Sequence, residues 1–361
     1  MKIAIILGTR PEIIKMSPLI RECEKLGIDH YILHTGQHYS FEMDKVFFDD
    51  LKLPVPRYNL DVGSGTHGQQ TGRMLQGIEE VLIKDRPDVL LVQGDTNTVL
   101  AGALAGSKLN IRIGHVEAGL RSFDRTMPEE INRIIADHIS DYLFAPTENS
   151  KEYLLAEGIP KEKIFVTGNT VVDAVYQNLE ISKQTRHTLS KLNLKEGEYF
   201  LTTVHRAENT DKKERLSRIL AGFEQIYQTF RLPIIFPAHP RTVKMIKEFD
   251  LEIPEGTKII NPVGYLDFLQ LEGGAKLILT DSGGLQEEGC ILGVPCVTLR
   301  DNTERPETVD VGANIIAGMN GNIAKFVERM TASGISWDNP YGSGDAAKLT
   351  IDRIIGCQIY R

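Results

Sequence analysis

The sequence predicts an α/β protein built from two doubly wound, Rossmann-like domains. The chain has 361 residues, which is long for a single hydrophobic core. Short runs rich in Val, Ile and Leu alternate with amphipathic segments, and such runs are typical of parallel strands covered by helices on both faces. The alternation restarts after a polar stretch at residues 183–198, so we expect two domains joined near residues 170–195.

The individual elements follow from apolar runs, helical periodicity and capping residues. In the first half we expect strands at residues 2–7, 30–33, 88–92, 111–115, 142–144 and 164–166, and helices at 11–26, 41–51, 68–84, 96–108, 128–139 and 147–157. In the second half we expect strands at 199–203, 233–236, 257–260, 276–279 and 296–298, and helices ending at 227 and spanning 242–249, 266–272, 284–292 and 345–356.

The composition is that of a soluble globular protein, with 41% apolar and 25% charged residues. The net charge of −8 argues against a nucleic-acid binder, which usually carries a basic face. The N-terminal apolar run is too short for a secretory signal, and no segment approaches the roughly 20 apolar residues of a membrane span. We therefore expect a cytoplasmic protein without membrane partners. The four cysteines form no C-x-x-C pair, and the His, Asp and Glu spacings predict no metal site.

Polar and glycine residues follow the predicted strands, where doubly wound sheets bind their ligands. The sharpest example is Asp281-Ser282-Gly283-Gly284, with Glu288 about one turn into the next helix. Glycines let backbone N–H groups approach a ligand, and a helix N-terminus favours an anion. We interpret this segment as a nucleotide or phosphate site, in which Glu288 accepts ribose hydroxyls; a serine N-cap with a glycine turn is the simpler alternative.

The first strand ends in a similar segment, Gly8-Thr9-Arg10-Pro11. Proline suits the first turn of a helix, and Arg10 would then face a phosphate oxygen. Lys15, one turn further, either reaches the site or lies on a solvated helix face. The pattern G-x-G-x-x-G at residues 63–68 follows no clean buried strand, so we interpret it as a loop rather than a dinucleotide fingerprint.

Three carboxylates form the candidate acid/base set. Asp95 and Glu117 each follow an apolar strand, and Glu129 opens a helix on which Arg133, four residues later, could orient it. Crowding would push one carboxyl pKa upward and provide an acid and a base together. For any one of them alone, a helix cap or a salt bridge is the ordinary role.

Two basic segments, His205-Arg206 and His239-Pro240-Arg241, follow strands of the second half. Beside a bound diphosphate, these side chains could contact phosphate or protonate a leaving group. An isolated histidine is more often structural, so this role depends on the nucleotide site.

Several segments, in conserved order over nearly the whole chain, resemble the non-hydrolysing UDP-N-acetylglucosamine (UDP-GlcNAc) 2-epimerases. They are GTRPEIIKMSP (8–18), GDTNTVLAGALA (94–105), GHVEAGLRS (114–122), PEEINR (128–133), PTENS (146–150), VTGNTVVDA (166–174), TDSGGLQEE (280–288), RDNTERPETV (300–309) and NPYGSG (339–344). So many matches in order are far more specific than any one motif.

The resemblance implies a two-domain fold of the glycosyltransferase-B type, with a central cleft and a last helix that returns to the first domain. We therefore place the domains at residues 1–170 plus about 345–361, and at about 171–344. It also implies that UDP is contacted by Arg10, Phe268, Ser282, Gly283 and Glu288, with Phe268 lining the uracil pocket. The implied catalytic set is Asp95, Glu117, Glu129 and His205, supported by Lys15 and Arg133.

The resemblance further implies a homodimer that needs no added cofactor. Several bacterial members bind a second UDP-GlcNAc as an activator through a glutamine-rich loop. Gln37-His38 matches the start of that loop. Ser40 stands where a second glutamine is frequent, and residues 205–208 lack the usual second arginine, so this chain departs from the activator pattern.

The implied reaction is reversible conversion of UDP-GlcNAc to UDP-N-acetylmannosamine (UDP-ManNAc), by loss of UDP to 2-acetamidoglucal and its re-addition. Two other classes stay open. A UDP-sugar glycosyltransferase of the same fold would need an acceptor groove, and a non-catalytic UDP-sugar sensor need not keep all three carboxylates. A hydrolysing relative would instead release UDP and free ManNAc.

Overall fold

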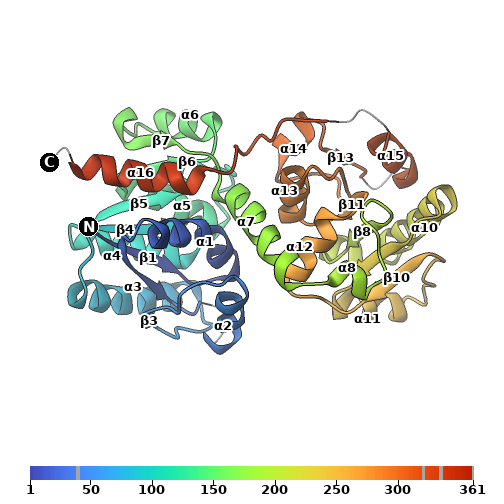
Figure 1. Ribbon diagram of the computed structural model, residues 1–361, viewed down its shortest axis with the longest axis horizontal. Helices are drawn as coiled ribbons and strands as arrows, with labels where there is room; N and C mark the ends of the chain where they lie inside the picture. The colour runs from blue at the N-terminus through green and yellow to red at the C-terminus, as the bar shows by residue number, and fades with distance from the viewer. Residues whose placement is uncertain (38–40, 319–321, 333–335, 360–361) are drawn as a thin grey trace. The chain divides into compact units, whose positions relative to one another are not determined.

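The computed structural model describes residues 1–37, 41–318, 322–332 and 336–359. The chain divides into two compact units (Figure 1): unit 1 contains Met1–Ala174 and Tyr341–Arg361, and unit 2 contains Val175–Pro340. Each unit holds one parallel sheet whose strands are connected through helices. The predicted α/β, doubly wound fold class is therefore confirmed.

Unit 1 contains a seven-stranded sheet in the order β3-β2-β1-β4-β5-β6-β7. Its strands are β1 (Lys2–Leu7), β2 (Asp29–His34), β3 (Tyr58–Asn59), β4 (Val89–Gln93), β5 (Arg112–Val116), β6 (Tyr142–Ala145) and β7 (Ile164–Val166). Residues on both faces of β1 are buried, as expected when helices cover both sides. The strand order reverses between β1 and β4, and ligands of doubly wound sheets bind beyond the strand ends at such a point.

The helices of unit 1 are α1 (Arg10–Lys25), α2 (Phe41–Asp50), α3 (His67–Lys84), α4 (Asn97–Lys108), α5 (Pro128–Ile139), α6 (Glu148–Ala156) and α16 (Ala346–Ile359), with a short 3-10 helix η1 (Lys161–Lys163). Apolar residues of α3, α4 and α5 pack on the sheet face that carries Ala4 and Ile6. The C-terminal helix α16 packs against α1 (Figure 1), so the end of the chain belongs to unit 1.

Unit 2 repeats this arrangement with six parallel strands in the order β10-β9-β8-β11-β12-β13. The strands are β8 (Phe200–Thr203), β9 (Ile234–Pro237), β10 (Thr257–Ile260), β11 (Leu277–Thr280), β12 (Cys296–Thr298) and β13 (Asn314–Ile316). The helices are α8 (Thr188–Lys191), α9 (Ala207–Thr210), α10 (Lys213–Phe230), α11 (Pro240–Glu248), α12 (Tyr265–Gly273), α13 (Gly283–Leu292), α14 (Pro306–Asp310) and α15 (Ile323–Met330). The order of this sheet reverses between β8 and β11.

The predicted elements are present with shifts of a few residues, but four stretches differ. The structure contains α7 (Thr170–Thr185) and α8 where we expected no element, the short strand β3, a break between α9 and α10 where we expected one helix, and the elements α14, β13 and α15 near the end of unit 2. The helix at α7 escapes a periodicity search because polar residues occupy several of its buried positions, among them Asp173, Asn178 and Ser182. No helix in the described part of the chain is both long and apolar enough to cross a membrane.

Candidate functional site

Glu117 lies directly after β5 and is held by three donors from unit 1. Lys15 on α1 donates to Glu117 Oε1 at 2.6 Å, and the Asn169 amide donates to the same oxygen at 3.1 Å. The Gln93 amide, at the end of the neighbouring strand β4, donates to Glu117 Oε2. The side chain is 6% exposed. Lys15 therefore points to the carboxylate rather than to solvent, and the three donors favour its ionised form.

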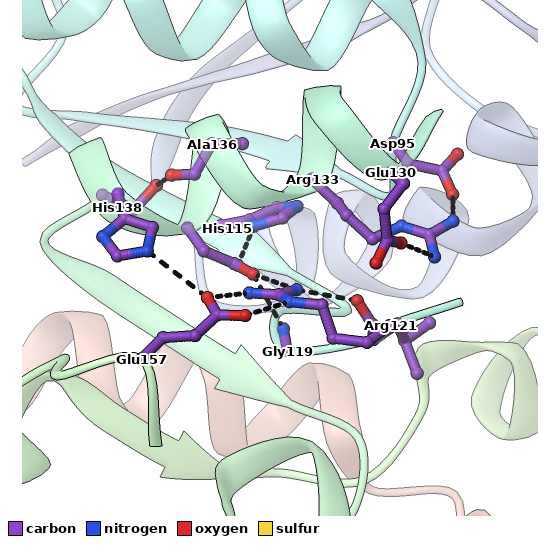
Figure 2. A network of polar contacts seen from close by, with 12 residues as sticks. Asp95, His115, Gly119, Arg121, Glu130, Arg133, Ala136, His138 and Glu157 are labelled. Atoms are coloured by element: carbon purple, nitrogen blue, oxygen red, sulfur yellow. Dashed lines mark hydrogen bonds and ion pairs between the residues drawn. The ribbon is translucent and has the colours of Figure 1, made fainter. Parts of the chain in front are cut away.

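Asp95 lies two residues after β4, the strand that pairs with β5 through Gln93 and Val116. Arg133 on α5 donates to Asp95 Oδ2 through one nitrogen and to Glu130 Oε2 at 2.9 Å through another (Figure 2). Glu130 is buried. Asp95 and Glu117 thus follow adjacent strands, and each is paired with a cation from a covering helix.

The expectation that Arg133 orients Glu129 is wrong. Its guanidinium contacts Glu130, one turn away on the same helix, and Asp95 across the strand end. Glu130 in turn accepts hydrogen bonds from the Ser122 and Phe123 backbone N–H groups at 3.0 and 2.9 Å. Glu129 is half-buried in the first turn of α5, and its carboxylate makes no hydrogen bond or ion pair with another described residue.

Arg10 begins α1 beyond the end of β1. Its Nε lies 3.2 Å from Asp44 Oδ1, and its guanidinium lies over the ring of Phe47 at 5.0 Å. The turn that presents it is held by Glu12, whose Oε2 accepts the Gly8 and Thr9 N–H groups at 2.7 and 2.8 Å. The buried Glu12 carboxylate thus fixes the turn that carries the basic side chain.

In unit 2, the buried Asp281 organises the loop after β8. Its Oδ1 lies 2.8 Å from His205 Nδ1, and its Oδ2 accepts the backbone N–H groups of His205 and Arg206, each at 2.9 Å. Burial raises the pKa of Asp281, but the hydrogen bonds from His205 and Arg206 outweigh that effect and leave the pKa below its ordinary value. His205 is therefore oriented by a carboxylate, while its side chain stays 46% exposed.

Ser282 forms the N-cap of α13, and Gly283 and Gly284 form its first turn. The Ser282 hydroxyl does not cap the helix. A Cβ built on Gly284 would meet no described atom closer than 3.9 Å, so nothing in the fold requires glycine there for packing. The first N–H groups of a helix have no partner within it, and this exposed glycine leaves them accessible to an anion.

A cavity of about 280 Å³ adjoins this helix start in unit 2. It is lined by residues at or just after strand ends, among them Thr203, His205, His239 and Ser282, and by Phe268 on α12. His239, which lines the cavity, accepts the Arg241 N–H at its Nδ1. Arg241 is not one of the lining residues, and its Nη2 lies 2.6 Å from Asp211 Oδ2. The structure thus gathers His205, His239, Phe268 and Ser282 around one cavity.

Glu288 on α13 has an unforeseen neighbour, Glu272 on α12, whose side chain is fully buried. Burial and then the charge and hydrogen bond of Glu288 raise the pKa of Glu272 well above its ordinary value. Neither Glu272 oxygen accepts a hydrogen bond from a described donor. Glu272 is therefore held as the neutral acid beside the Glu288 carboxylate.

This pair predicts a pH-dependent stability. A carboxyl whose pKa is raised by folding stabilises the protein fully below its unfolded pKa, and that contribution is lost as the pH rises through the folded pKa. Glu272→Gln, which is neutral at every pH, is expected to raise the thermal unfolding midpoint relative to the parent chain more at pH 8 than at pH 5. The exposed Glu224→Gln on α10 is the control. An equal difference at both pH values would contradict the assignment.

Two further expectations concern the activator loop and metal binding. His38 and Ser40 lie outside the described residues. The buried Gln37 side chain, three residues after β2, accepts a hydrogen bond from the Thr98 hydroxyl on α4 at 2.9 Å. Among the described residues, no group of three or more His, Cys, Asp or Glu side chains could hold a metal ion.

Sequence reasoning missed Gln93, Asn169, Glu12 and Glu272 as site residues, and it named Asp281 only as part of the Asp281-Ser282-Gly283-Gly284 segment. Gln93 ends an apolar strand, and a position at a strand end is the signal that selected Asp95, Glu117 and the Asp281 segment. Asn169 follows the predicted strand at 164–166 by three residues, as Asp95 follows the predicted strand at 88–92, so the same signal could have found it. Glu272 lies inside α12 and carries no such signal.

Comparisons with known proteins point to one family. The family model described as UDP-N-acetylglucosamine 2-epimerase matches residues 21–355. The UDP-N-acetylglucosamine 2-epimerase of Methanocaldococcus jannaschii is 60% identical over 358 residues, covering 97% of this chain and 98% of that protein. A solved structure of a UDP-GlcNAc 2-epimerase from that organism is similar with a TM-score of 0.91, at 57% identity and full coverage of both chains. Its complex with UDP-GlcNAc and UDP gives a TM-score of 0.81, at 59% identity and full coverage of both chains.

Proposed function

We propose that this chain, which belongs to the UDP-N-acetylglucosamine 2-epimerase family, interconverts UDP-GlcNAc and UDP-ManNAc by elimination and re-addition of UDP. The chain is an enzyme of the isomerase class. The observation that carries the proposal is the pair Asp95 and Glu117, two carboxylates on adjacent strand ends, each bound to a cation.

The C2 proton of the sugar is not adjacent to a carbonyl, so its removal needs a leaving group. A carboxylate takes the C2 proton, the C–H electron pair forms the C1=C2 double bond of 2-acetamidoglucal, and the C1–O bond breaks with its electrons leaving on UDP. A UDP β-phosphate oxygen then bonds to C1 again, and a carboxylic acid on the other side delivers a proton to the opposite face of C2. The reaction is balanced without an oxidant or reductant.

The two units supply different parts of this chemistry. We assign proton transfer to two of the three carboxylates Asp95, Glu117 and Glu129. Lys15 is assigned to hold Glu117 in place, and Arg133 to hold Asp95. We assign the UDP moiety to unit 2, where the uracil would bind near Phe268 and the ribose near Glu288. The diphosphate would then meet Ser282, Gly283 and the N-terminus of α13, which stabilise the charge that develops on the leaving group. His205, His239 and Arg241 of unit 2 are assigned to the same diphosphate.

The family resemblance also supports a cytoplasmic homodimer. Activation by a second UDP-GlcNAc has less support, because the sequence departs from the activator pattern at Ser40 and in residues 205–208.

The test is incubation of the purified protein with UDP-GlcNAc alone in D₂O, followed by NMR of the sugar H1 and H2 signals. We expect UDP-ManNAc to form and deuterium to enter C2 of both sugars while the link to UDP is kept. Release of UDP and free ManNAc would identify a hydrolysing enzyme. UDP binding without any exchange would contradict the proposal and favour the sensor or the glycosyltransferase.

A further inference from the structure

His115 is a fully buried histidine at the end of β5, two residues before Glu117, and it has no role in the reaction proposed above. Both of its ring nitrogens face acceptors. Nδ1 lies 2.7 Å from Asp137 Oδ1 on α5, and Nε2 lies 2.8 Å from the Gly94 carbonyl oxygen. A carbonyl oxygen only accepts hydrogen bonds, so Nε2 must carry a hydrogen.

The surroundings of Asp137 require a hydrogen on Nδ1 as well. Asp137 Oδ2 lies 2.7 Å from Arg121 Nη1 and accepts the Gly119 N–H at 3.2 Å, and the side chains of Asp137 and Arg121 are buried. Asp137 Oδ2 takes the Arg121 and Gly119 donors, and Oδ1 of the same carboxylate faces the ring as an acceptor, so Nδ1 donates to it. With both ring nitrogens donating, the ring is an imidazolium cation.

The charges around the ring agree with this state. Burial lowers the pKa of His115, but the Asp137 charge and hydrogen bond, the Gly94 carbonyl and the Glu117 charge outweigh it and raise the pKa above its ordinary value. The positive charge of Arg121, which is bound to Asp137 and also to Glu157 at 2.7 Å, opposes protonation of the ring. The positive charge of Lys15, which is bound to Glu117, acts in the same direction. The ring therefore stays protonated to a higher pH than a solvated histidine.

This cation holds the turn that carries Asp95. Gly94 has a φ of +85°, its N–H donates to the Val116 carbonyl at 3.1 Å, and its own carbonyl accepts from His115. Both polar groups of the residue before Asp95 are therefore fixed by β5.

The same cluster holds Glu117. This residue has a φ of +65°, in the left-handed region that residues with a Cβ avoid, and it persists only where its neighbours are fixed. Asp137 binds the His115 ring, two residues before Glu117, and the Gly119 N–H, two residues after it. One buried carboxylate thus anchors both sides of the strained residue.

We propose that His115, held as an imidazolium between Asp137 and Gly94, is a positioning residue that fixes Asp95 and Glu117 and adds a buried positive charge beside them. It contacts no substrate in this role. The effect on turnover rests on the proposed function, whereas the charge state of the ring does not.

Two variants test the role. In His115→Gln the side-chain amide can still donate to Gly94 but carries no charge, and in Asp137→Asn the anchor keeps its shape but loses its charge. Each is expected to lower kcat by up to about 100-fold with little change in KM, because misplacing catalytic groups by about 1 Å costs this much. The pH dependence of kcat is a second readout, and a mere loss of packing would not change it. The kcat of the parent chain should fall as the pH rises through the raised His115 pKa, and in Asp137→Asn this fall should begin at lower pH.

The charge state is measured directly by nitrogen NMR of the full chain labelled at histidine. One ring should carry hydrogens on both nitrogens at pH 8, and its signals should be missing in His115→Gln. His30→Gln is the matched control. The His30 ring also bonds a backbone carbonyl, that of Ile28 at 2.8 Å, but His30 lies at the start of β2, whereas His115 lies near the end of β5. The His30→Gln variant should keep both kcat and the pH profile.

Neutral His115 at pH 8, or unchanged kcat and pH profile in both variants, would overturn the proposal. If His115→Gln fails to fold, Asp137→Asn and the spectrum of the parent chain still decide it. A protonated ring in a chain that shows no exchange in D₂O would count against the epimerase mechanism and leave the charge assignment intact.

Discussion

Replacing Glu117 by Gln or Asp95 by Asn is expected to lower kcat by roughly 10²–10⁴-fold, the usual contribution of a general acid or base. The amide keeps the shape of the side chain but cannot exchange a proton with C2. UDP affinity should be nearly unchanged, because neither carboxylate is among the proposed nucleotide contacts. Deuterium incorporation measures the first quantity and calorimetric titration with UDP the second.

The same variants can separate the two carboxylates. If each carboxylate serves one face of C2, the variant that cannot deprotonate UDP-GlcNAc should still eliminate UDP from UDP-ManNAc, and the reverse should hold for its counterpart. Glu129→Gln completes the set, since Glu129 makes no hydrogen bond or ion pair with a described side chain that would indicate its role. Glu148→Gln, whose side chain is 67% exposed on α6, is the control and should keep full turnover. Wild-type turnover in all three site variants would remove the carboxylates from the mechanism.

The positions of Asp95 and Glu117 could be predicted because the end of a buried strand is visible in the sequence as the end of an apolar run. In a doubly wound sheet, polar residues at those points gather on one edge, so order along the chain is enough to select them. The Asp281-Ser282-Gly283-Gly284 segment was found by the same rule. Its structure adds that Asp281 faces His205, a residue 76 positions away.

The partners of these side chains could not be predicted in the same way. Helical periodicity relates residues three or four positions apart, so it predicted that Arg133 pairs with Glu129. The structure pairs Arg133 with Asp95, 38 positions away, and Glu117 with Asn169, 52 positions away. Such pairs depend on how elements pack, which a single sequence does not contain.

The helix α7 was missed for a related reason. Its buried Asp173 accepts the Ala346 and Ala347 N–H groups at the start of α16, at 3.2 and 3.0 Å. Its buried Ser182 donates to the Leu266 carbonyl at 2.5 Å. Polar residues whose partners lie elsewhere in the fold interrupt the apolar pattern, although they satisfy buried hydrogen-bonding groups as completely as a helix cap would.

Gly284→Ala is expected to separate stability from ligand binding, with effects of opposite sign. Gly284 is exposed in the first turn of α13, its φ is not positive, and an added Cβ would meet no described atom closer than 3.9 Å. Alanine lowers the backbone entropy of the unfolded chain, so the variant should be as stable as the parent chain or more stable by about 0.5 kcal/mol.

The same methyl group would stand where we propose that the diphosphate approaches the helix N-terminus. UDP affinity is therefore expected to fall at least about tenfold, or about 1.4 kcal/mol. Calorimetric titration with UDP and thermal unfolding of the free protein measure the two quantities. Gly293 is unsuitable as a control because its φ is +74°, whereas Gly68, on α3 in unit 1 with nothing within 4 Å of an added Cβ, is suitable. Gly68→Ala should leave UDP affinity unchanged. An unaltered UDP affinity in Gly284→Ala would contradict the assignment of the diphosphate to α13. A diphosphate bound to the N–H donors of the helix N-terminus would be obstructed by a methyl group placed between the diphosphate and those donors.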